Sequence, residues 1–299
     1  MNRKILYFIN PISGPRRKIS LHEIIAKKTL EKNIPFEIIF TTVNEDYEDL
    51  PGKIKKEKIT DIVICGGDGT VNRVAASVLD LDVNIGIIPA GSGNGLALTA
   101  KIPRQIDKAL EVVFNGKTNY IDGFFINEKF SCMLCGIGFD AQVAHDFALQ
   151  KERGLSTYIK ETFKNFITSS TWPFDITIKG KTFSVNAFFV SIANGNQFGN
   201  NVTIAPKASL NDGLLDIIIV KKMSKARLVW AVLKQINAGE VRKNTERNFH
   251  KKDVLYFQAD KINISNPSMA PLHIDGEPSE TNKKFVIEIL PSALRLLQP

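Results

Sequence analysis

The stretch Asp61-Ile-Val-Ile-Cys-Gly-Gly-Asp-Gly-Thr70 decides how this chain is interpreted. A short apolar run, typical of a buried strand, ends in three glycines, an aspartate and a threonine, and an amphipathic helix pattern follows from Val71. A strand, a glycine turn and a helix N-terminus together direct backbone N–H groups at one anion, and glycine lets a phosphate approach closely. The carboxylate of Asp68 would repel a bare phosphate, so we expect it to meet a metal ion or take a proton from an attacking hydroxyl.

The same stretch excludes two common nucleotide-binding motifs. It contains no Gly-Lys-Ser/Thr, so it is not a P-loop, and the order Gly67, Gly69, Asn72 does not match the dinucleotide fingerprint. The alternative interpretation is a tight strand-to-helix turn that uses glycine only for its geometry. Three glycines and an aspartate exceed what such a turn needs, so we favour a phosphate site.

Length and composition limit the class of protein. A chain of 299 residues with 43% apolar residues is expected to form two packed domains. The apolar run at residues 5–9 is too short for a signal peptide, and no stretch approaches the length of a membrane span. Three cysteines, an odd number, suit a reducing cytoplasm. Cys132 and Cys135 have no second cysteine pair, so we interpret them as ordinary thiols.

The net charge of +8 is concentrated in residues 221–252, which hold ten Lys or Arg and two Glu. Ten minus two equals the whole excess, so the rest of the chain is neutral. Within this segment Leu228 and Trp230 fall outside the main apolar stripe of a helix pattern, and such a helix among basic residues can dock on an anionic membrane surface. The alternative is a core-facing helix with a solvated basic flank. We expect no nucleic acid partner, because no aromatic stacking platform accompanies the charges.

The first 120 residues alternate strand and helix patterns. Strands are expected at 4–9, 36–42, 61–65 and 84–89, with helices from about Ser20, after Thr70 and over 106–114, while a polar stretch broken by Pro51-Gly52 has no assigned element. This rhythm predicts a parallel sheet with helices on both faces, whose ligands bind at the carboxyl ends of the strands. After Asp122, two helical stretches (140–151, 156–169) precede strand-like runs that predict an antiparallel sandwich-type domain, at 174–179, 183–193, 214–220, 254–258, 262–265 and 285–290.

Four loops fall at the carboxyl ends of the predicted parallel strands, at residues 10–14, 41–42, 66–70 and 91–95. The two glycine-rich loops could hold one triphosphate between them, with Ser92 and Asn94 as side-chain donors. In the first loop, Asn10, Ser13 and Arg16 would add donors and a cation, although Asn-Pro and Ser-Gly are also ordinary turn pairs.

Two acidic loops stand out in the second half. His273-Ile-Asp-Gly-Glu-Pro278 is either a polar hairpin turn or a site where Glu277 accepts the proton of an acceptor hydroxyl. Leu210-Asn-Asp-Gly-Leu-Leu-Asp216 is either a turn that enters a strand or a hard-cation site that uses Asp212 and carbonyl oxygens.

Taken in order, these segments resemble the diacylglycerol kinase catalytic-domain family, the bacterial soluble lipid kinases related to sphingosine and ceramide kinases. Gly-Gly-Asp-Gly alone is shared with NAD kinases and phosphofructokinases, whereas the ordered set is more specific. The resemblance runs nearly end to end and rests on Asn10-Pro-Ile-Ser-Gly14, Gly66-Gly-Asp-Gly-Thr70, Gly91-Ser-Gly-Asn94, Gly136-Ile-Gly-Phe-Asp140, Asp212-Gly-Leu-Leu and Asp275-Gly-Glu277.

The resemblance implies an NAD kinase/diacylglycerol kinase-like fold. A Rossmann-like parallel α/β domain would cover residues 1–123 and an antiparallel β-sandwich domain residues 124–287, with residues 288–299 returning to the first domain. It also implies an ATP-dependent, Mg²⁺-dependent kinase that phosphorylates a membrane-embedded lipid hydroxyl. Such an enzyme would be cytoplasmic, peripherally bound to the inner face of the membrane and active in phospholipid biosynthesis, with a homodimer as one option for its assembly.

The resemblance further assigns roles to individual residues. Glu277 matches the proton acceptor, and Asp68 and Asp122 match acidic partners in a magnesium–water network. A structural Mg²⁺ is implied at Ser209, Asp212 and Leu214. Nucleotide contacts are implied at Asn10, Pro11, Ile12, Ser13, Gly14, Arg16, Thr42 (or Thr41), Gly66, Gly67, Gly69, Thr70, Asn72, Gly91, Ser92 and Asn94.

One departure leaves the lipid open. Bacterial diacylglycerol kinases commonly have Gly-Thr-x-Asn-Asp where this chain has Gly91-Ser-Gly-Asn94-Gly95, which is more similar to sphingosine and ceramide kinases. Two other functions stay open as well: a kinase for a soluble acceptor such as NAD, and a non-catalytic lipid or nucleotide sensor on the same fold.

Overall fold

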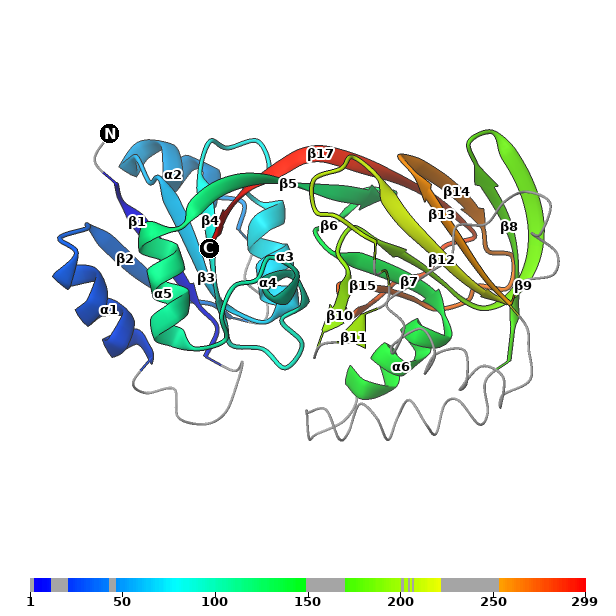
Figure 1. The fold of residues 1–299 in the computed structure, drawn as a ribbon, viewed down its shortest axis with the longest axis horizontal. Helices are drawn as coiled ribbons and strands as arrows, with labels where there is room; N and C mark the ends of the chain where they lie inside the picture. The colour runs from blue at the N-terminus through cyan, green and yellow to red at the C-terminus, as the bar shows by residue number, and fades with distance from the viewer. Residues whose placement is uncertain are drawn as a thin grey trace. The chain divides into compact units, whose positions relative to one another are not determined.

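A parallel sheet organises the first part of the chain in the computed structural model, which describes residues 3–11, 21–42, 47–148, 170–199, 202–203, 205, 207–221 and 253–299. Its strands are β1 (Ile5–Ile9), β2 (Phe36–Phe40), β3 (Asp61–Gly66) and β4 (Asn84–Pro89), in the order β2-β1-β3-β4 (Figure 1). β1 and β3 are buried throughout, which explains why they appear in the sequence as continuous apolar runs. The predicted parallel sheet is therefore confirmed.

The helices of this part are α1 (Leu21–Glu31), α2 (Leu50–Glu57), α3 (Asp68–Ala76), α4 (Gly95–Thr99) and α5 (Ile106–Asn115). α3 packs on β3, and α5 packs on β4. The sequence pattern missed α2, because Pro51 and Gly52 were taken as breakers. Pro51 lies in the first turn, where its missing N–H costs nothing, and Leu50 and Ile54 are buried.

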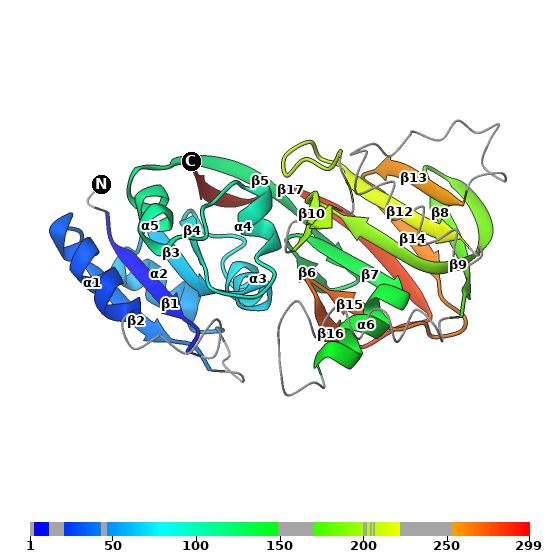
Figure 2. The same cartoon turned by 60° about the horizontal axis from the view of Figure 1, so that its bottom comes forward.

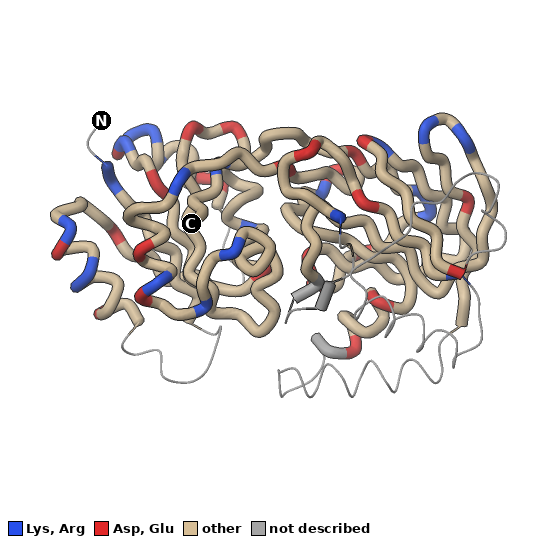
Figure 3. The backbone as a smooth tube through the Cα atoms, viewed as in Figure 1, with Lys and Arg blue, Asp and Glu red and all other residues tan. Residues whose placement is uncertain are grey.

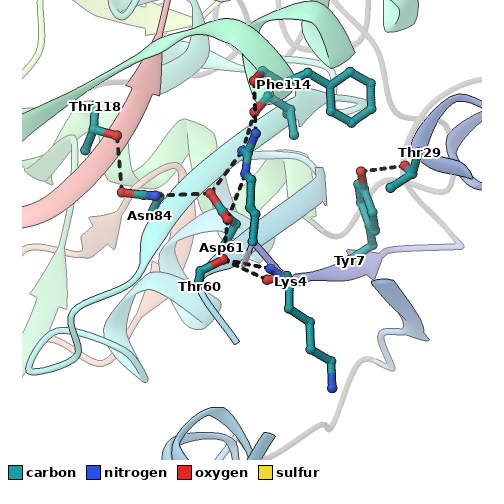
Figure 4. Close-up of polar contacts among 10 residues, drawn as sticks. Lys4, Tyr7, Thr29, Thr60, Asp61, Asn84, Phe114 and Thr118 are labelled. Carbon is teal, nitrogen blue, oxygen red and sulfur yellow. Dashed lines mark hydrogen bonds and ion pairs between the residues drawn. The ribbon is translucent and has the colours of Figure 1, made fainter. Parts of the chain in front are cut away.

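A buried carboxylate joins the amino-terminal ends of these strands. Asp61 begins β3 and is fully buried, and both of its oxygens accept hydrogen bonds from Arg3, at 2.9 and 3.0 Å (Figure 4). Thr60 and Asn84 donate to the same carboxylate at 2.6 and 3.1 Å. Arg3 also donates to the carbonyl oxygen of Phe114 at the end of α5. This network lies at the end of the sheet opposite the glycine loops, so its role is structural.

The second part of the chain is antiparallel and is organised around β9 (Lys181–Ala193). β9 pairs with β7 (Leu134–Gly138), β8 (Trp172–Ile178) and β12 (Leu215–Lys221). β12 also pairs with β13 (Val254–Ala259), and β8 pairs with β14 (Lys261–Ser265). Its core is a single apolar cluster that includes Phe174, Ile192, Ile217, Ile264 and Phe285. The antiparallel second domain predicted from the sequence is confirmed.

The remaining elements of this part include helix α6 (Phe139–Ala148), which lies against β7, β15 (Leu272–Ile274) and β16 (Glu277–Ser279) (Figure 2). Residues 149–169, which contain the end of the first predicted helical stretch and all of the second, lie outside the described residues. The short strands are β6 (Lys129–Ser131), β10 (Gln197–Gly199), β11 (Val202–Thr203), β15 (Leu272–Ile274) and β16 (Glu277–Ser279).

Two long strands, β5 (Lys117–Ile126) and β17 (Lys284–Gln298), belong to both parts of the chain. Residues 284–288 of β17 pair with β14, whereas Arg295 and Leu296 add a parallel strand beside β4. The chain accordingly divides into a first unit, Met1–Ile121 with Ser292–Pro299, and a second unit, Asp122–Pro291. Within the described residues, no helix combines the length and apolar character needed to cross a membrane.

Candidate active site

The glycine loops that follow β3 and β4 are in backbone contact. A Cβ placed on Gly91 would collide with the Cα of Gly67, so neither loop has room for a side chain at this point. Asn94 closes the second loop, because its side chain accepts the Gly91 N–H at 2.8 Å and donates to the Gly91 carbonyl at 2.7 Å. Both loops therefore meet at one edge of the sheet, at the carboxyl ends of neighbouring strands.

The loop that follows β1 joins the same edge through Asn10. The Nδ2 of Asn10 donates to the Oγ1 of Thr70 at 2.8 Å, and its backbone N–H donates to the carbonyl oxygen of Cys65 at 2.9 Å. Thr70 is buried in the first turn of α3 and packs against Gly66, where an added Cβ would come within 2.8 Å of the threonine Cβ. These contacts hold the ends of β1 and β3 and the start of α3 together.

Asp68 occupies the first position of α3, directly after the N-cap residue Gly67. It is half-buried, and its Oδ1 accepts the N–H of Leu96 in the first turn of α4 at 3.4 Å. A negative charge is stabilised at a helix N-terminus, and this carboxylate lies at two of them. Neither α4 nor the contact with Leu96 was predicted from the sequence, because both depend on how the second glycine loop folds back onto the first.

The other residues predicted to contact nucleotide fall into three groups. Pro11, Thr42 and Ser92 are exposed, and Asn72 is half-buried in α3. Thr41, the alternative to Thr42, is buried at the end of β2. Ile12, Ser13, Gly14 and Arg16 lie outside the described residues.

The acidic loop near the end of the second unit is a two-residue hairpin turn between β15 and β16. Ile274 pairs with Glu277, and Asp275 and Gly276 have φ angles of 49° and 82°. Both angles lie in the left-handed region that a type I′ turn requires, and Asp-Gly is a preferred sequence for that turn. The local structure is thus the hairpin alternative, and it leaves Glu277 exposed at the first position of β16.

The carboxylate of Asp275 faces inward and binds the chain between β6 and β7. It accepts hydrogen bonds from the backbone N–H groups of residues 132, 133 and 134 at 3.2, 3.2 and 2.9 Å, and from the Ser131 hydroxyl at 2.7 Å. Burial raises the pKa of the Asp275 carboxyl, while these hydrogen bonds oppose the shift. Asp275 therefore fixes the turn, and Glu277 is the exposed carboxylate of this hairpin.

Asp122 is buried at the start of the second unit and is bonded to the other acidic loop. Its Oδ2 accepts the N–H of Gly213 at 2.8 Å, and its backbone N–H donates to the carbonyl oxygen of Leu210 at 2.6 Å. Asp212 lies within the same loop, next to Gly213, and its Oδ1 accepts the N–H of Leu214 at 3.1 Å. Burial raises the pKa of Asp212, and the charge of Asp122 raises it further, so the two carboxylates lie close enough to repel.

This loop has donors that suit a hard cation. Ser209 offers a hydroxyl, Asp212 a carboxylate oxygen and Leu214 a main-chain carbonyl, and Mg²⁺ and Ca²⁺ both prefer oxygen ligands. A cation would also relieve the repulsion between Asp122 and Asp212. In the part of the chain that the structure describes, no three His, Cys, Asp or Glu side chains are arranged to hold a metal, so an ion here would depend on main-chain oxygens.

Sequence reasoning assigned no role to Asp216, the last residue of this acidic segment. Asp216 is fully buried in β12, and its Oδ1 accepts hydrogen bonds from the Tyr256 hydroxyl and from Gln258. Burial, followed by the charge of Asp212, raises the pKa of Asp216 to about 7. Its strand pattern looked apolar, and no local signal distinguishes a buried aspartate from a surface one.

The structure does not describe the segment that carries the net charge. Apart from Lys221, residues 221–252 fall in the range drawn as a grey trace. Among the described residues, Lys and Arg positions and Asp and Glu positions are both distributed along the backbone of each unit (Figure 3). The membrane-binding hypothesis for residues 221–252 therefore stays a prediction.

Comparison with known proteins identifies the family. Residues 4–126 match the diacylglycerol kinase catalytic domain, and residues 134–298 match the YegS C-terminal NAD kinase β-sandwich-like domain. The chain belongs to the diacylglycerol kinase catalytic-domain family. The resemblance inferred from the ordered motifs is thereby confirmed, and the second match covers more than half of the chain.

Relatives in this family are named as lipid kinases. A probable lipid kinase YegS-like protein of Yersinia enterocolitica is 30% identical over 249 residues, which cover 81% of this chain and 79% of the relative. A protein of the same name from Shewanella frigidimarina is 28% identical, with 81% and 78% covered. The crystal structure of a diacylglycerol kinase from Bacillus anthracis str. Sterne matches with a TM-score of 0.75 and 21% identity over 99% of this chain and 97% of that one. This last likeness confirms the fold.

Proposed function

We propose that this chain is an ATP- and Mg²⁺-dependent kinase that transfers the γ-phosphoryl group of ATP to a hydroxyl of a membrane lipid. The observation that carries the proposal is the convergence of Asn10, the loop 66–70 and the loop 91–94 at the carboxyl ends of three parallel strands. Glycine backbone and a helix N-terminus at such an edge suit a polyphosphate. Family membership supports a kinase, and the names of the relatives support a lipid acceptor.

Phosphoryl transfer needs positioning and charge neutralisation more than covalent chemistry. In the proposal, the glycine loops and Asn10 hold the phosphates, and Thr42, Ser92 and Asn72 add contacts around the nucleotide. Mg²⁺, when bound, would neutralise phosphate charge. Asp68 and Asp122 would orient the water molecules and charges around the phosphates, and Glu277 would accept the proton of the acceptor hydroxyl.

A second, structural Mg²⁺ would be held by Ser209, Asp212 and Leu214. The loop that these residues form is already bonded to Asp122 through the Gly213 N–H. A cation that stiffens the loop would therefore also restrict the orientation of the Asp122 side chain. The donor set supports this assignment, because every donor is a hard oxygen.

The test is phosphorylation of a panel of acceptors with ATP and Mg²⁺. Diacylglycerol, monoacylglycerol, phosphatidylglycerol, ceramide and sphingosine are presented in vesicles, and NAD is presented in solution. We expect phosphate on at least one lipid and none on NAD. Phosphorylation of NAD alone would favour the soluble-acceptor alternative, and ATP binding without transfer to any acceptor would favour a sensor.

A further inference from the structure

A buried Asp–His pair lies directly behind the hairpin that carries Glu277. His273 in β15 is fully buried, and its Nε2 is 3.5 Å from the Oδ2 of Asp140, which is also buried at the start of α6. Gly136 of β7 is the register partner of His273, and its lack of a side chain makes room for the pair. A Cβ on Gly136 would collide with the Asp140 carboxylate and come within 2.5 Å of the His273 Nε2.

The other nitrogen of this imidazole faces the hairpin turn. The Nδ1 of His273 accepts the backbone N–H of Gly276 at 3.3 Å. Because Nδ1 accepts a hydrogen bond, the neutral ring carries its proton on Nε2, the ring nitrogen that lies nearest the Asp140 carboxylate. At 3.5 Å the two atoms interact by charge and dipole and are not hydrogen-bonded. Asp140 is itself oriented, since its Oδ1 accepts the N–H of Ala141 at 2.8 Å. The pair therefore forms a chain of contacts from the N-terminus of α6 to the residue that precedes Glu277.

The rest of the turn is already fixed by other contacts. The N–H of Asp275 donates to the carbonyl oxygen of Leu134 at 2.8 Å, and the Asp275 carboxylate binds residues 131–134. A second contact from α6 holds the same strand, because the Nε2 of His145 is 2.8 Å from the carbonyl oxygen of Leu272. The bond from Gly276 to His273 thus couples the backbone next to Glu277 to α6, by way of the Asp140 side chain.

We propose that Asp140 and His273 are positioning residues for Glu277: Asp140 selects the imidazole tautomer that holds the Gly276 N–H and so fixes the backbone from which the base projects. The inference rests on the proposed role of Glu277 as proton acceptor. A general base must lie within hydrogen-bond reach of its proton, and a misplacement of about 1 Å can cost about 100-fold in rate. The alternative is that Asp140 and His273 only stabilise the second unit and do not affect the position of Glu277.

The sharpest variant is Asp140→Asn, which keeps the shape of the side chain. The introduced amide can still accept the Ala141 N–H, but its NH₂ group then faces the Nε2 of His273. The ring must respond by moving its proton to Nδ1, where it faces the Gly276 N–H and can no longer accept it. We expect kcat to fall by about 10–100-fold while the KM for ATP stays within about twofold, because the nucleotide loops lie in the first unit.

Two substitutions of His273 test whether an acceptor for the Gly276 N–H restores kcat. His273→Ala removes the acceptor, and we expect a loss of kcat similar to that of Asp140→Asn. His273→Asn places an amide oxygen near the position of Nδ1, so it should recover most of the lost kcat. The matched control is Asn266→Ala, which removes a fully buried side chain of the same unit. Its hydrogen bonds go to Ala270, Thr281 and Asn282 and not to the turn at residues 275–276. This substitution should lower the unfolding midpoint without lowering kcat per folded molecule.

Nitrogen-15 NMR of the ring reports the tautomer of His273 directly, and hydrogen exchange of the Gly276 amide reports the bond. In Asp140→Asn, the proton of the His273 ring should move to Nδ1, and hydrogen exchange of the Gly276 amide should accelerate. An unchanged tautomer or an unchanged exchange rate would overturn the inference even if activity fell, because Asp140 would then act in another way.

A double-substitution cycle separates positioning from a general structural effect. Asp140→Asn should reduce kcat in the wild-type background but cause no further loss in Glu277→Gln, since no base remains to be positioned. Equal losses in both backgrounds would overturn the inference. Wild-type turnover of Glu277→Gln would instead overturn the proposed role of Glu277, whereas wild-type turnover of Asp140→Asn beside an inactive Glu277→Gln would overturn only the positioning role.

Discussion

Asp275→Asn tests whether the inward carboxylate fixes the turn that carries Glu277. The substitution turns one oxygen into an NH₂ group while the amide oxygen keeps the bonds from Ser131 and Leu134, at 2.7 and 2.9 Å in the wild type. The NH₂ group must then face the Cys132 N–H, whose present acceptor lies at 3.2 Å. A buried donor left without an acceptor costs about 1–3 kcal/mol.

One effect opposes this cost. Burial raises the pKa of Asp275, so a neutral side chain is less expensive to bury at this position than a carboxylate. Charge-assisted bonds are roughly twice as strong as neutral ones, and all of the surviving bonds weaken. We therefore expect a net loss of about 1–2 kcal/mol in the free energy of unfolding.

Asp275→Ala should cost more, about 3–5 kcal/mol, because it removes every one of these acceptors at once. It also places alanine at a φ of 49°, which Asp and Asn tolerate better than alanine does. The Asn variant therefore isolates the hydrogen bonds, and the Ala variant adds the backbone strain.

The assay is urea unfolding followed by tryptophan fluorescence. The chain has two tryptophans, Trp172 and Trp230, and both fall within Asp122–Pro291, so the signal follows the second unit. Asp260→Asn is the matched control, since it makes the same chemical change at an exposed turn of that unit and should stay within about 0.5 kcal/mol of wild type. If Asp275→Asn unfolds at the same urea concentration as wild type or higher, burial of the charge outweighs its bonds and the reasoning is wrong.

Four further outcomes are expected. Asp68→Asn should lower kcat by at least ~100-fold with little change in Tm, and near-wild-type turnover would remove Asp68 from the mechanism. Glu277→Gln should lower kcat by about 10²–10⁴-fold while ATP affinity by calorimetry stays intact; equal weakening of ATP binding would contradict its role as base. Glu57 accepts hydrogen bonds from Lys4 and Lys53, which lower the pKa of its carboxyl from 4.5 to about 2. Because the folded-state pKa lies below the unfolded one, the stability that Glu57 contributes is present above pH 4.5 and is lost as pH falls toward 2. The difference in unfolding midpoint between wild type and Glu57→Gln should shrink over that range, and a constant difference would argue against the ion pairs. Replacement of five basic residues by Gln should weaken sedimentation of the protein with anionic vesicles at low salt and raise the KM for a vesicle substrate. Turnover on a dispersed short-chain lipid should not change. Equal binding of the wild-type protein to neutral and anionic vesicles would contradict the membrane-binding hypothesis. The five residues are Arg242, Lys243, Arg247, Lys251 and Lys252.

The sequence was most informative where burial and local turn chemistry agree. β1 and β3 are buried on both faces, so they appear as short apolar runs between turn residues, and the predicted and observed bounds differ by one residue. α2 was missed because proline and glycine usually interrupt helices, yet the first turn of a helix tolerates both. Local sequence signals thus locate most elements. They fail where a residue that disrupts the interior of a helix is tolerated in its first turn, as Pro51 and Gly52 are in α2.

The candidate site was predictable as a set of loops but not as a set of contacts. The bonds from Asn10 to Thr70 and from Leu96 to Asp68 span 60 and 28 residues, and nothing local to either residue encodes them. The acidic hairpin shows the same limit. Asp275 and Glu277 look equivalent in the sequence, and only the register of β15 against β7 turns one carboxylate inward and leaves the other exposed.

The shared strand β17 has a consequence for how the chain is made. The outer edge of β4 is completed by Arg295 and Leu296, which the ribosome adds more than two hundred residues after Pro89. The first unit therefore cannot finish its sheet while the second unit is being synthesised, and during that interval β4 presents unpaired backbone groups that could pair with another nascent chain. A protease cut or frameshift that removes residues 292–299 would destabilise the first unit, although in the sequence these residues directly follow the second unit. The fold thus makes the maturation of the proposed nucleotide site wait until the residues of β17 have been synthesised.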